Sequence, residues 1–134
     1  MEDSEYMRKT KQTDYRELDI FKEFSDLSRE LRESIQQMKR YYRFDVGDEI
    51  RRLLREIKYK ISDINSIPNN CKLEKLVSLC SLLNHLEIAL SDCIEEGSLS
   101  LKGRYNINLP LSRLANVKTQ AINWKNYIED KYSQ

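Results

Sequence analysis

The chain has 134 residues with only 3 glycines and 2 prolines, and 34% of its residues are charged although the formal net charge is +1. This length suits one domain with a real core, and the scarcity of glycine and proline favours helices over a sheet. We expect no apolar run long enough to span a membrane and no secretory leader, and therefore a cytoplasmic protein without a membrane partner.

Basic and acidic residues are segregated along the chain. Residues 1–34 carry 7 basic and 10 acidic residues, and residues 61–97 carry 2 and 6. Residues 39–60 carry 8 basic and 4 acidic residues, and residues 98–134 carry 6 and 2. A basic surface would therefore form if the two basic segments shared one side of the fold.

Residues 1–13 carry many charges and no apolar periodicity, so a flexible tail is predicted ahead of a helical domain over residues 14–134. Asp14, with Glu17 three residues later, has the form of a capping box at a helix start. Apolar residues then recur at three- and four-residue steps, which predicts one buried stripe on a long helix: Ile20, Phe24, Leu27, Leu31, Ile35 and Met38.

A second helix is predicted to begin within FDVGDE, with Asp45 as its N-cap. Asp48 and Glu49 would then lie in its first turn, where the helix dipole favours negative charge. Its apolar face would consist of Ile50, Leu53, Leu54, Ile57, Ile61 and Ile64. The segment SIPNN, which contains Pro68, predicts a turn after this helix.

A third helix is predicted from about Lys72 to Glu96, with Gly97 as its C-terminal stop. Its apolar residues cover more of the circumference than those of the first two helices, which indicates either a central helix or a contact with another subunit. The candidates for an oligomer interface are Leu79, Leu82, Leu86 and Leu90.

The fourth helix is predicted with most certainty from about Leu111, with Pro110 in its first turn or at a break. Its inner face would consist of Leu114, Val117, Ala121, Trp124 and Ile128. Because the connections between the four helices are short, neighbouring helices should be antiparallel. The sequence therefore predicts an all-α, antiparallel up-down four-helix bundle.

The sequence shows no constellation of residues that would support catalysis. It has no glycine-rich phosphate loop and no H-E-x-x-H motif. Its three cysteines form no C-x-x-C pair, and its one histidine, His85, falls on a polar strip without a nucleophile nearby in sequence. We therefore predict no catalytic residue, no metal site, no cofactor and no enzymatic activity.

Basic residues line one flank of the predicted second helix. Successive helical residues advance by about 100°, so Arg51, Arg55 and Lys58 form one stripe beside the apolar face. Lys118 and Lys125 form a similar row on the fourth helix, and Arg40 and Arg43 flank two tyrosines just before the second helix. Arginine and lysine neutralise phosphates and tyrosine stacks on bases, but the same pattern is typical of a solvated helix face with ion pairs.

Several motifs resemble those of one known family. The segment YRFDVGDEIRRLL, residues 42–54, is similar to a Y-R-F-x-L-G-D signature of the Avd-like four-helix-bundle proteins, the accessory variability determinants of diversity-generating retroelements. YRELDIF at 15–21 and the leucine-rich 73–97 followed by SLSLKGRY resemble the family's first helix, its third helix and the opening of its fourth. LANVKTQAINW at 114–124 lies where the family has a helix that closes on G-R-x-L-x-x-W, with Lys118 and Thr119 in place of the Gly-Arg pair. The related proteins of ribosomal RNA intervening sequences carry A-E-G after an S-I-P-x-N motif, which this chain lacks after SIPNN.

The resemblance implies a non-enzymatic accessory protein that assembles as a homopentameric ring. Such a ring would bind a reverse transcriptase and its template RNA or RNA/cDNA during mutagenic retrohoming. The contact residues would then be Arg40, Arg43, Arg51, Arg55, Lys58, Lys118 and Lys125. Two alternatives are a bundle of the ribosomal RNA intervening-sequence type and a protein-protein interaction module without nucleic-acid binding.

Overall fold

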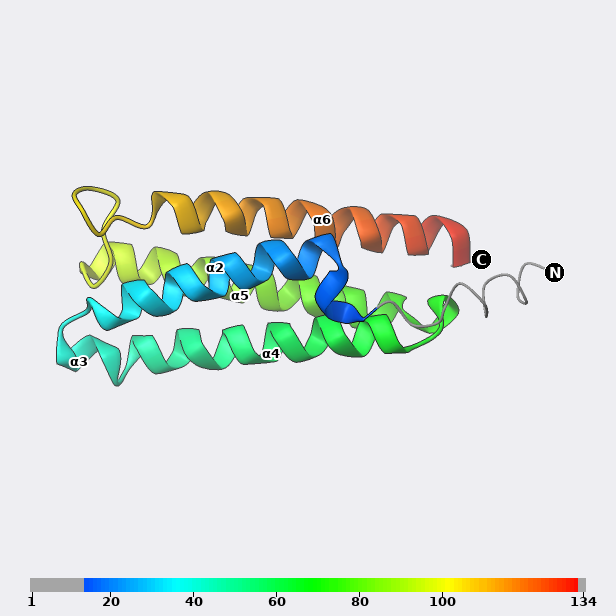
Figure 1. The fold of residues 1–134 in the computed structure, drawn as a ribbon, viewed down its shortest axis with the longest axis horizontal. Helices are drawn as coiled ribbons and strands as arrows, with labels where there is room; N and C mark the ends of the chain where they lie inside the picture. The colour runs from blue at the N-terminus through cyan, green and yellow to red at the C-terminus, as the bar shows by residue number, and fades with distance from the viewer. Residues whose placement is uncertain (1–13, 133–134) are drawn as a thin grey trace.

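The computed structural model describes residues 14–132, and within them it is helical without any strand, which confirms the all-α prediction (Figure 1). The predicted tail over residues 1–13 lies outside this range. The four long helices are α2 (Asp19–Gln36), α4 (Val46–Ser66), α5 (Leu73–Glu96) and α6 (Asn108–Tyr132). The shorter elements are η1 (Tyr15–Glu17), α3 (Arg40–Arg43) and η2 (Asn69–Cys71).

The long helices lie side by side, and each runs opposite to the one before it (Figure 1). Among the described residues, α2 packs on α4, α4 on α5, α5 on α6, and α6 on α2. The helices therefore follow one another around the bundle, so that α4 and α6 occupy diagonally opposite corners.

The core consists of the apolar stripes that the sequence predicts. Every residue of the two predicted stripes on α2 and α4 is at most 6% exposed. On α6, Leu114, Val117, Ala121 and Ile128 are buried, while Trp124 is only half-buried against the core. Each helix thus removes one face from water, which is the dominant stabilising contribution in a domain of this size.

The first helix begins later than predicted. The Asp14 carboxylate does act as a cap, since it accepts a hydrogen bond from the Arg16 backbone N–H at 3.0 Å, but the turn it caps is the 3₁₀ helix η1. Leu18 then adopts an extended conformation, with ψ of 137°, and α2 starts at Asp19. The break turns η1 away from the axis of α2 (Figure 1).

The start of α4 is predicted correctly in position but not in its capping bond. Asp45 is the N-cap residue of α4, yet its side chain makes no capping hydrogen bond. Instead the short helix α3 leads directly into α4, and the Asp45 backbone N–H donates to the Tyr42 carbonyl at 3.3 Å.

The predicted ends of α5 and the start of α6 agree closely with the structure. Gly97 closes α5 in the left-handed conformation, with φ of 85°, where a side chain would be strained. Pro110 lies in the first turn of α6, where its missing N–H costs no helical hydrogen bond.

Three of the four leucines proposed for an oligomer interface belong to the core of the single chain. Leu79, Leu86 and Leu90 are all 0% exposed, so they have no surface to offer a second copy. Leu82 is half-buried, and the large apolar side chains that α5 does expose are Val77 and Ile88. The wide apolar circumference of α5 therefore combines a buried face, which packs against α4 and α6, with the exposed Val77 and Ile88.

By length and composition alone, α5 could cross a membrane, contrary to our expectation from the sequence. This is weak evidence for a membrane span, because the core helix of a soluble protein passes the same test. One face of α5 is buried by neighbouring helices in this chain.

A cluster of ion pairs joins α6 to α2. The Arg113 guanidinium donates to Glu23 and to Glu30 at 2.8 Å each, and the three side chains are 27%, 22% and 14% exposed. The two carboxylates raise the pKa of Arg113 further, so it stays charged. Planar, partly buried pairs of this kind fix the register of two helices more specifically than apolar contacts do.

Gly47 permits the close approach of α4 to the end of α2. A Cβ atom at this position would lie 2.9 Å from Ile35 Cγ2 and 3.4 Å from the Tyr42 carbonyl oxygen. Ile35 is only 1% exposed, and its Cγ2 is attached directly to Cβ, so this atom has little room to move. The glycine of the FDVGD motif is thus explained by packing.

We predict that Gly47→Ala destabilises the fold. Alanine favours a helix over glycine by about 1 kcal/mol, but overpacking a buried contact costs about 1–3 kcal/mol. We expect the free energy of unfolding in urea to fall by about 1 kcal/mol net.

The matched test is a double-mutant cycle with Ile35→Leu, which removes the clashing Cγ2 atom. The two substitutions together should destabilise less than the sum of their separate effects. Strictly additive effects would show that the Ile35 contact does not explain the glycine.

Candidate nucleic-acid interface

A shallow groove of about 530 Å³ runs between α2 and α4. Its α2 wall carries small serines, Ser25 and Ser28, which leave room between the two helices. The full lining is Phe21, Phe24, Ser25, Ser28, Arg29, Arg32, Glu33, Gln36 and Lys58. Both walls therefore carry basic side chains above an apolar floor.

Of the basic stripe that the sequence predicts on α4, Lys58 lines the groove, whereas Arg51 and Arg55 line a neighbouring cleft with Asp45, Asp48 and Glu49. Arg55 and Lys58 are exposed, and neither forms an ion pair within the described part of the chain. Arg51 is 28% exposed, pairs with Asp48 at 2.9 Å and also donates to the Arg43 carbonyl at 3.4 Å. Two of the three stripe residues are thus free to meet an anion, whereas Arg51 is already engaged.

The α2 wall adds two arginines that we did not single out from the sequence. Arg32 donates from Nε to Ser28 Oγ at 3.2 Å and has no ion pair among residues 14–132. Arg29 pairs with Asp26 at 3.0 Å. The helical spacing of Ser25, Ser28 and Arg32 could have predicted that they share one flank of the helix. The net negative charge of residues 1–34 instead led us to expect no basic surface there.

Lys118 and Lys125 do not lie on this groove. They line a small cleft of about 150 Å³ between α5 and α6, together with Cys80 and Ile122. Lys118 Nζ pairs with Glu87 of α5 at 2.8 Å, and Lys125 Nζ lies 3.8 Å from Glu129. The basic rows on α4 and α6 do not share a side, because these two helices are diagonal in the bundle.

Arg40 and Arg43 lie on α3, at the end of the bundle where α2 finishes and α4 begins (Figure 1). Arg40 is exposed, and its guanidinium stacks over the Phe44 ring at 5.7 Å. Arg43 is half-buried, and its Nε atom is buried without a hydrogen-bond partner. The bond from Arg51 to the Arg43 carbonyl joins this end to α4.

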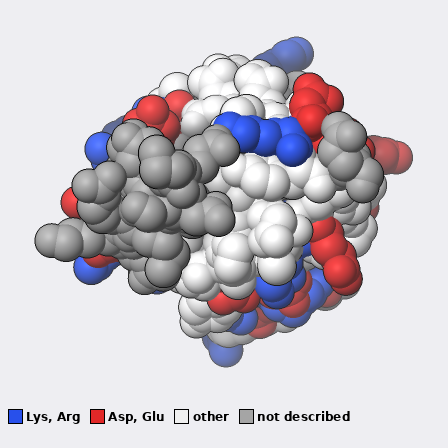
Figure 2. Space-filling model, turned by 90° about the vertical axis from the view of Figure 1, so that its right-hand side faces the viewer, with Lys and Arg blue, Asp and Glu red and all other residues white. Residues whose placement is uncertain are grey.

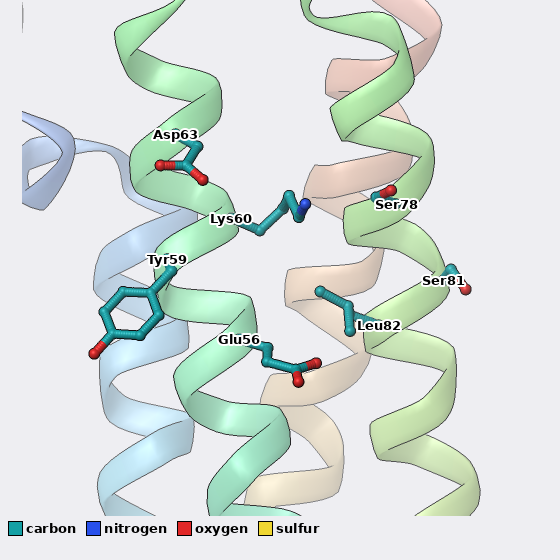
Figure 3. Close-up of a pocket in the computed structure, with 7 residues that line it drawn as sticks. All are labelled: Glu56, Tyr59, Lys60, Asp63, Ser78, Ser81 and Leu82. Carbon is teal, nitrogen blue, oxygen red and sulfur yellow. The ribbon is translucent and has the colours of Figure 1, made fainter.

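A second cleft of about 370 Å³ lies between α4 and α5. Glu56 and Lys60 extend from α4 toward α5, and Leu82 extends back toward α4, whereas Tyr59 points away (Figure 3). Neither histidine nor cysteine lines this cleft, and Glu56 is held by Arg52 at 2.5 Å. Its mixed charges suit neither a phosphate nor an apolar ligand.

The end of the bundle opposite α3 carries no gathered basic patch in the face that Figure 2 shows. Its centre is mostly uncharged, with basic and acidic side chains both present, and undescribed residues cover part of it. The groove and the α3 end therefore remain the two basic surfaces of interest.

The cysteines and the histidine show no shared site. Cys71 is exposed, Cys80 half-buried and Cys93 buried, and all three are free. Burial raises the pKa of the Cys80 and Cys93 thiols, which keeps them protonated and unreactive. His85 is exposed, and within residues 14–132 no three His, Cys, Asp or Glu side chains gather as a metal site would require.

Comparison with protein-family models, with curated proteins and with solved structures returns no match for this chain. The family resemblance therefore rests on the motifs quoted above, and the argument for function rests on those motifs and on the groove.

Proposed function

We propose that this chain is a non-enzymatic accessory protein of a diversity-generating retroelement, in which it binds the reverse transcriptase and the template RNA or RNA/cDNA. The RFDVGD motif supports the family, and the groove between α2 and α4 supports nucleic-acid binding. The single observation that carries the second part is that Lys58 of α4 and Arg32 of α2 line one groove without forming an ion pair among the described residues, with unpaired Arg55 about one turn before Lys58 on α4.

The groove has the chemistry that a phosphate backbone requires. Each unpaired lysine or arginine that meets a phosphate releases condensed counterions, which favours binding and makes it dependent on salt. Serine hydroxyls on the α2 wall add hydrogen-bond donors for phosphate oxygens.

We also propose that the chain, as an antiparallel up-down four-helix bundle, assembles as a homopentamer. The outward face of α5 supports this assembly, because its apolar side chains Val77 and Ile88 are 52% and 58% exposed. They lie eleven positions apart, which is close to three full turns, so they share one line along the helix. Ser81 and Asn84 lie near the same line, so its middle carries no charge to desolvate.

A second candidate function is a protein-protein interaction module without a nucleic-acid role. The observation in its favour is that several cations are satisfied internally. Arg52 pairs with Glu49 and Glu56, Lys118 pairs with Glu87, and Arg113 is bound to α2. These pairs reduce the number of cations that could meet a phosphate.

We predict that removing the free cations of the groove weakens RNA binding. The variant Arg32→Ala/Arg55→Ala/Lys58→Ala should bind structured RNA more weakly. The slope of log affinity against log salt should also fall by about 0.7–0.9 for each lost phosphate contact. Fluorescence anisotropy across a salt series measures both quantities.

The matched control is Lys118→Ala/Lys125→Ala, which removes two cations from the opposite edge of the bundle. It should leave the salt slope close to that of the wild-type chain. An equal loss in both variants would refute the assignment to the groove, and a wild-type chain that binds no RNA at low salt would favour the interaction module.

We predict that the chain co-purifies with the reverse transcriptase encoded beside its gene when the two are expressed together. Tagged reverse transcriptase should retain the wild-type chain on a column after washing at moderate salt. Failure to retain it, or a gene located within a ribosomal RNA gene without a reverse transcriptase nearby, would contradict the retroelement assignment.

We predict a solution mass about five times the 16.0 kDa of one chain by light scattering. Ile88→Asp should shift the mass toward that of a monomer, because a charge in a desolvated contact is costly. The residue is exposed in the single chain, so the helical circular dichroism should be retained. A monomeric wild-type chain at high concentration would contradict the assembly.

A further inference from the structure

Exposed aromatic rings gather at the end of the bundle where α3 lies. Tyr41 and Phe44 are 76% and 67% exposed, and Tyr105, in the connection between α5 and α6, is 56% exposed. Figure 1 places α3 and this connection at the same end. We call the surface formed by Lys39, Arg40, Tyr41, Phe44, Leu101, Lys102, Arg104 and Tyr105 the aromatic end.

The connection between α5 and α6 holds Tyr105 outward on an ordered loop. Leu99 and Ile107, at 6% and 0% exposure, anchor its two sides in the core. Between them, the Ile107 backbone N–H donates to the Ser100 carbonyl at 2.9 Å, and Asn106 Nδ2 donates to the Gly103 carbonyl at 2.6 Å. Asn108 Nδ2 also donates to the Leu101 carbonyl at 2.9 Å. The exposure of the ring is therefore built into the loop.

The α3 side is held in place as well. The Tyr42 hydroxyl donates to the Glu96 carbonyl at 3.5 Å, which ties α3 to the last turn of α5. Tyr41 packs edge-to-face on Tyr42 with ring centroids 5.4 Å apart. Most of the Tyr41 side chain nevertheless stays exposed to water. Exposing an aromatic ring costs free energy, and the folding of the single chain does not explain why this ring is exposed.

Cations stand beside these rings without acidic partners. Arg40 lies over Phe44 at 5.7 Å and Arg104 over Tyr105 at 5.5 Å. Within residues 14–132, none of the four lysines and arginines of the aromatic end forms an ion pair. The sequence from Gly97 to Ile128 contains no acidic residue at all.

We infer that the aromatic end binds an unpaired nucleic-acid strand, whose bases stack on Tyr41, Phe44 and Tyr105 while its phosphates meet the adjoining cations. This inference rests on the nucleic-acid role proposed above and narrows its ligand to single strands. Exposed rings interleaved with cations suit single strands, because a duplex closes its base faces to side chains.

The geometry of the bundle sets the length of strand that fits. Tyr41 and Phe44 precede α4, and Tyr105 precedes α6; these two helices occupy diagonally opposite corners of the bundle. Helices that pack about 10 Å apart place diagonal corners about 14 Å apart, and stacked nucleotides advance about 3.4 Å each, so about four nucleotides connect the two sets of rings.

The charges around the aromatic end also favour a flexible strand. Glu95 and Glu96 are exposed at the end of α5 and would repel a rigid duplex laid across the whole end. The end of α2 carries the uncharged Gln36 and Gln37 instead, and α2 borders both α4 and α6. A single strand can follow this uncharged path, and Gln36 also lines the groove, so the path leads into it.

The test compares two probes and two matched variants. Fluorescence anisotropy measures binding of a labelled oligouridylate and of an RNA duplex of equal length. The variant Tyr41→Leu/Tyr105→Leu removes two rings from the aromatic end but keeps apolar bulk. The control Tyr59→Leu/Tyr127→Leu removes two rings of similar exposure, 60% and 53%, from elsewhere on α4 and α6.

We expect the aromatic-end variant to bind oligouridylate at least about tenfold more weakly, since it loses two rings on which bases would stack. Duplex binding should stay unchanged, and the control should match the wild-type chain with both probes. Oligouridylate carrying 4-thiouridine should crosslink to residues 39–44 and 101–105 of the wild-type chain.

Several results would overturn the inference. The aromatic-end variant could bind oligouridylate as tightly as the wild-type chain does, or the control variant could lose as much affinity as the aromatic-end variant. The wild-type chain could also bind no oligouridylate at all. A change in solution mass caused by the aromatic-end variant alone would assign the surface to a contact between copies. If one of these results is found but the wild-type chain still binds the RNA duplex and is still retained by the reverse transcriptase, the inference fails while the proposed function is supported.

Discussion

Burial of one apolar stripe from each long helix determines where every charged side chain of this protein can lie. Four stripes share one core, and the connections between the helices are short, so each helix packs beside the next. Once the stripes face inward, the flanks of each helix can meet only those of its two neighbours. The groove between α2 and α4, the Arg113 ion pairs between α2 and α6, and the cleft between α5 and α6 all follow from this order.

The formal net charge of +1 says little about the surface that such packing creates. What matters for an anionic partner is which cations remain without a carboxylate after folding. Arg113 and Lys118 are engaged with α2 and α5, so they contribute to the contacts between helices. Arg55 and Lys58 have no such partner and stand on one flank, where a modest number of charges is concentrated.

The sequence predicted the core well because helical periodicity depends on local spacing alone. The stripe from Ile20 to Met38 and the closure of α5 at Gly97 required no knowledge of distant residues. The start of α2 was predicted less well, since the extended conformation of Leu18 depends on how η1 packs.

The surface was predicted less well for a similar reason. That Lys118 and Lys125 lie apart from Arg55 follows from the diagonal placement of α4 and α6, which no helical wheel contains. Leu79, Leu86 and Leu90 were grouped with Leu82 because apolar residues on two flanks of α5 look alike in sequence. Only the neighbouring helices decide that the first three are fully buried and the last is not.

The α3 elbow connects the packing of the bundle to its surface chemistry. Gly47 lets α4 begin against the end of α2, which leaves the four-residue helix α3 to turn the corner outside the core. None of the α3 residues is buried, and the turn that closes the core presents Arg40 and Tyr41 to solvent. The RFDVGD motif therefore combines two roles, because its glycine serves packing while the aromatic and basic residues around it form the surface that we assign to unpaired nucleic acid.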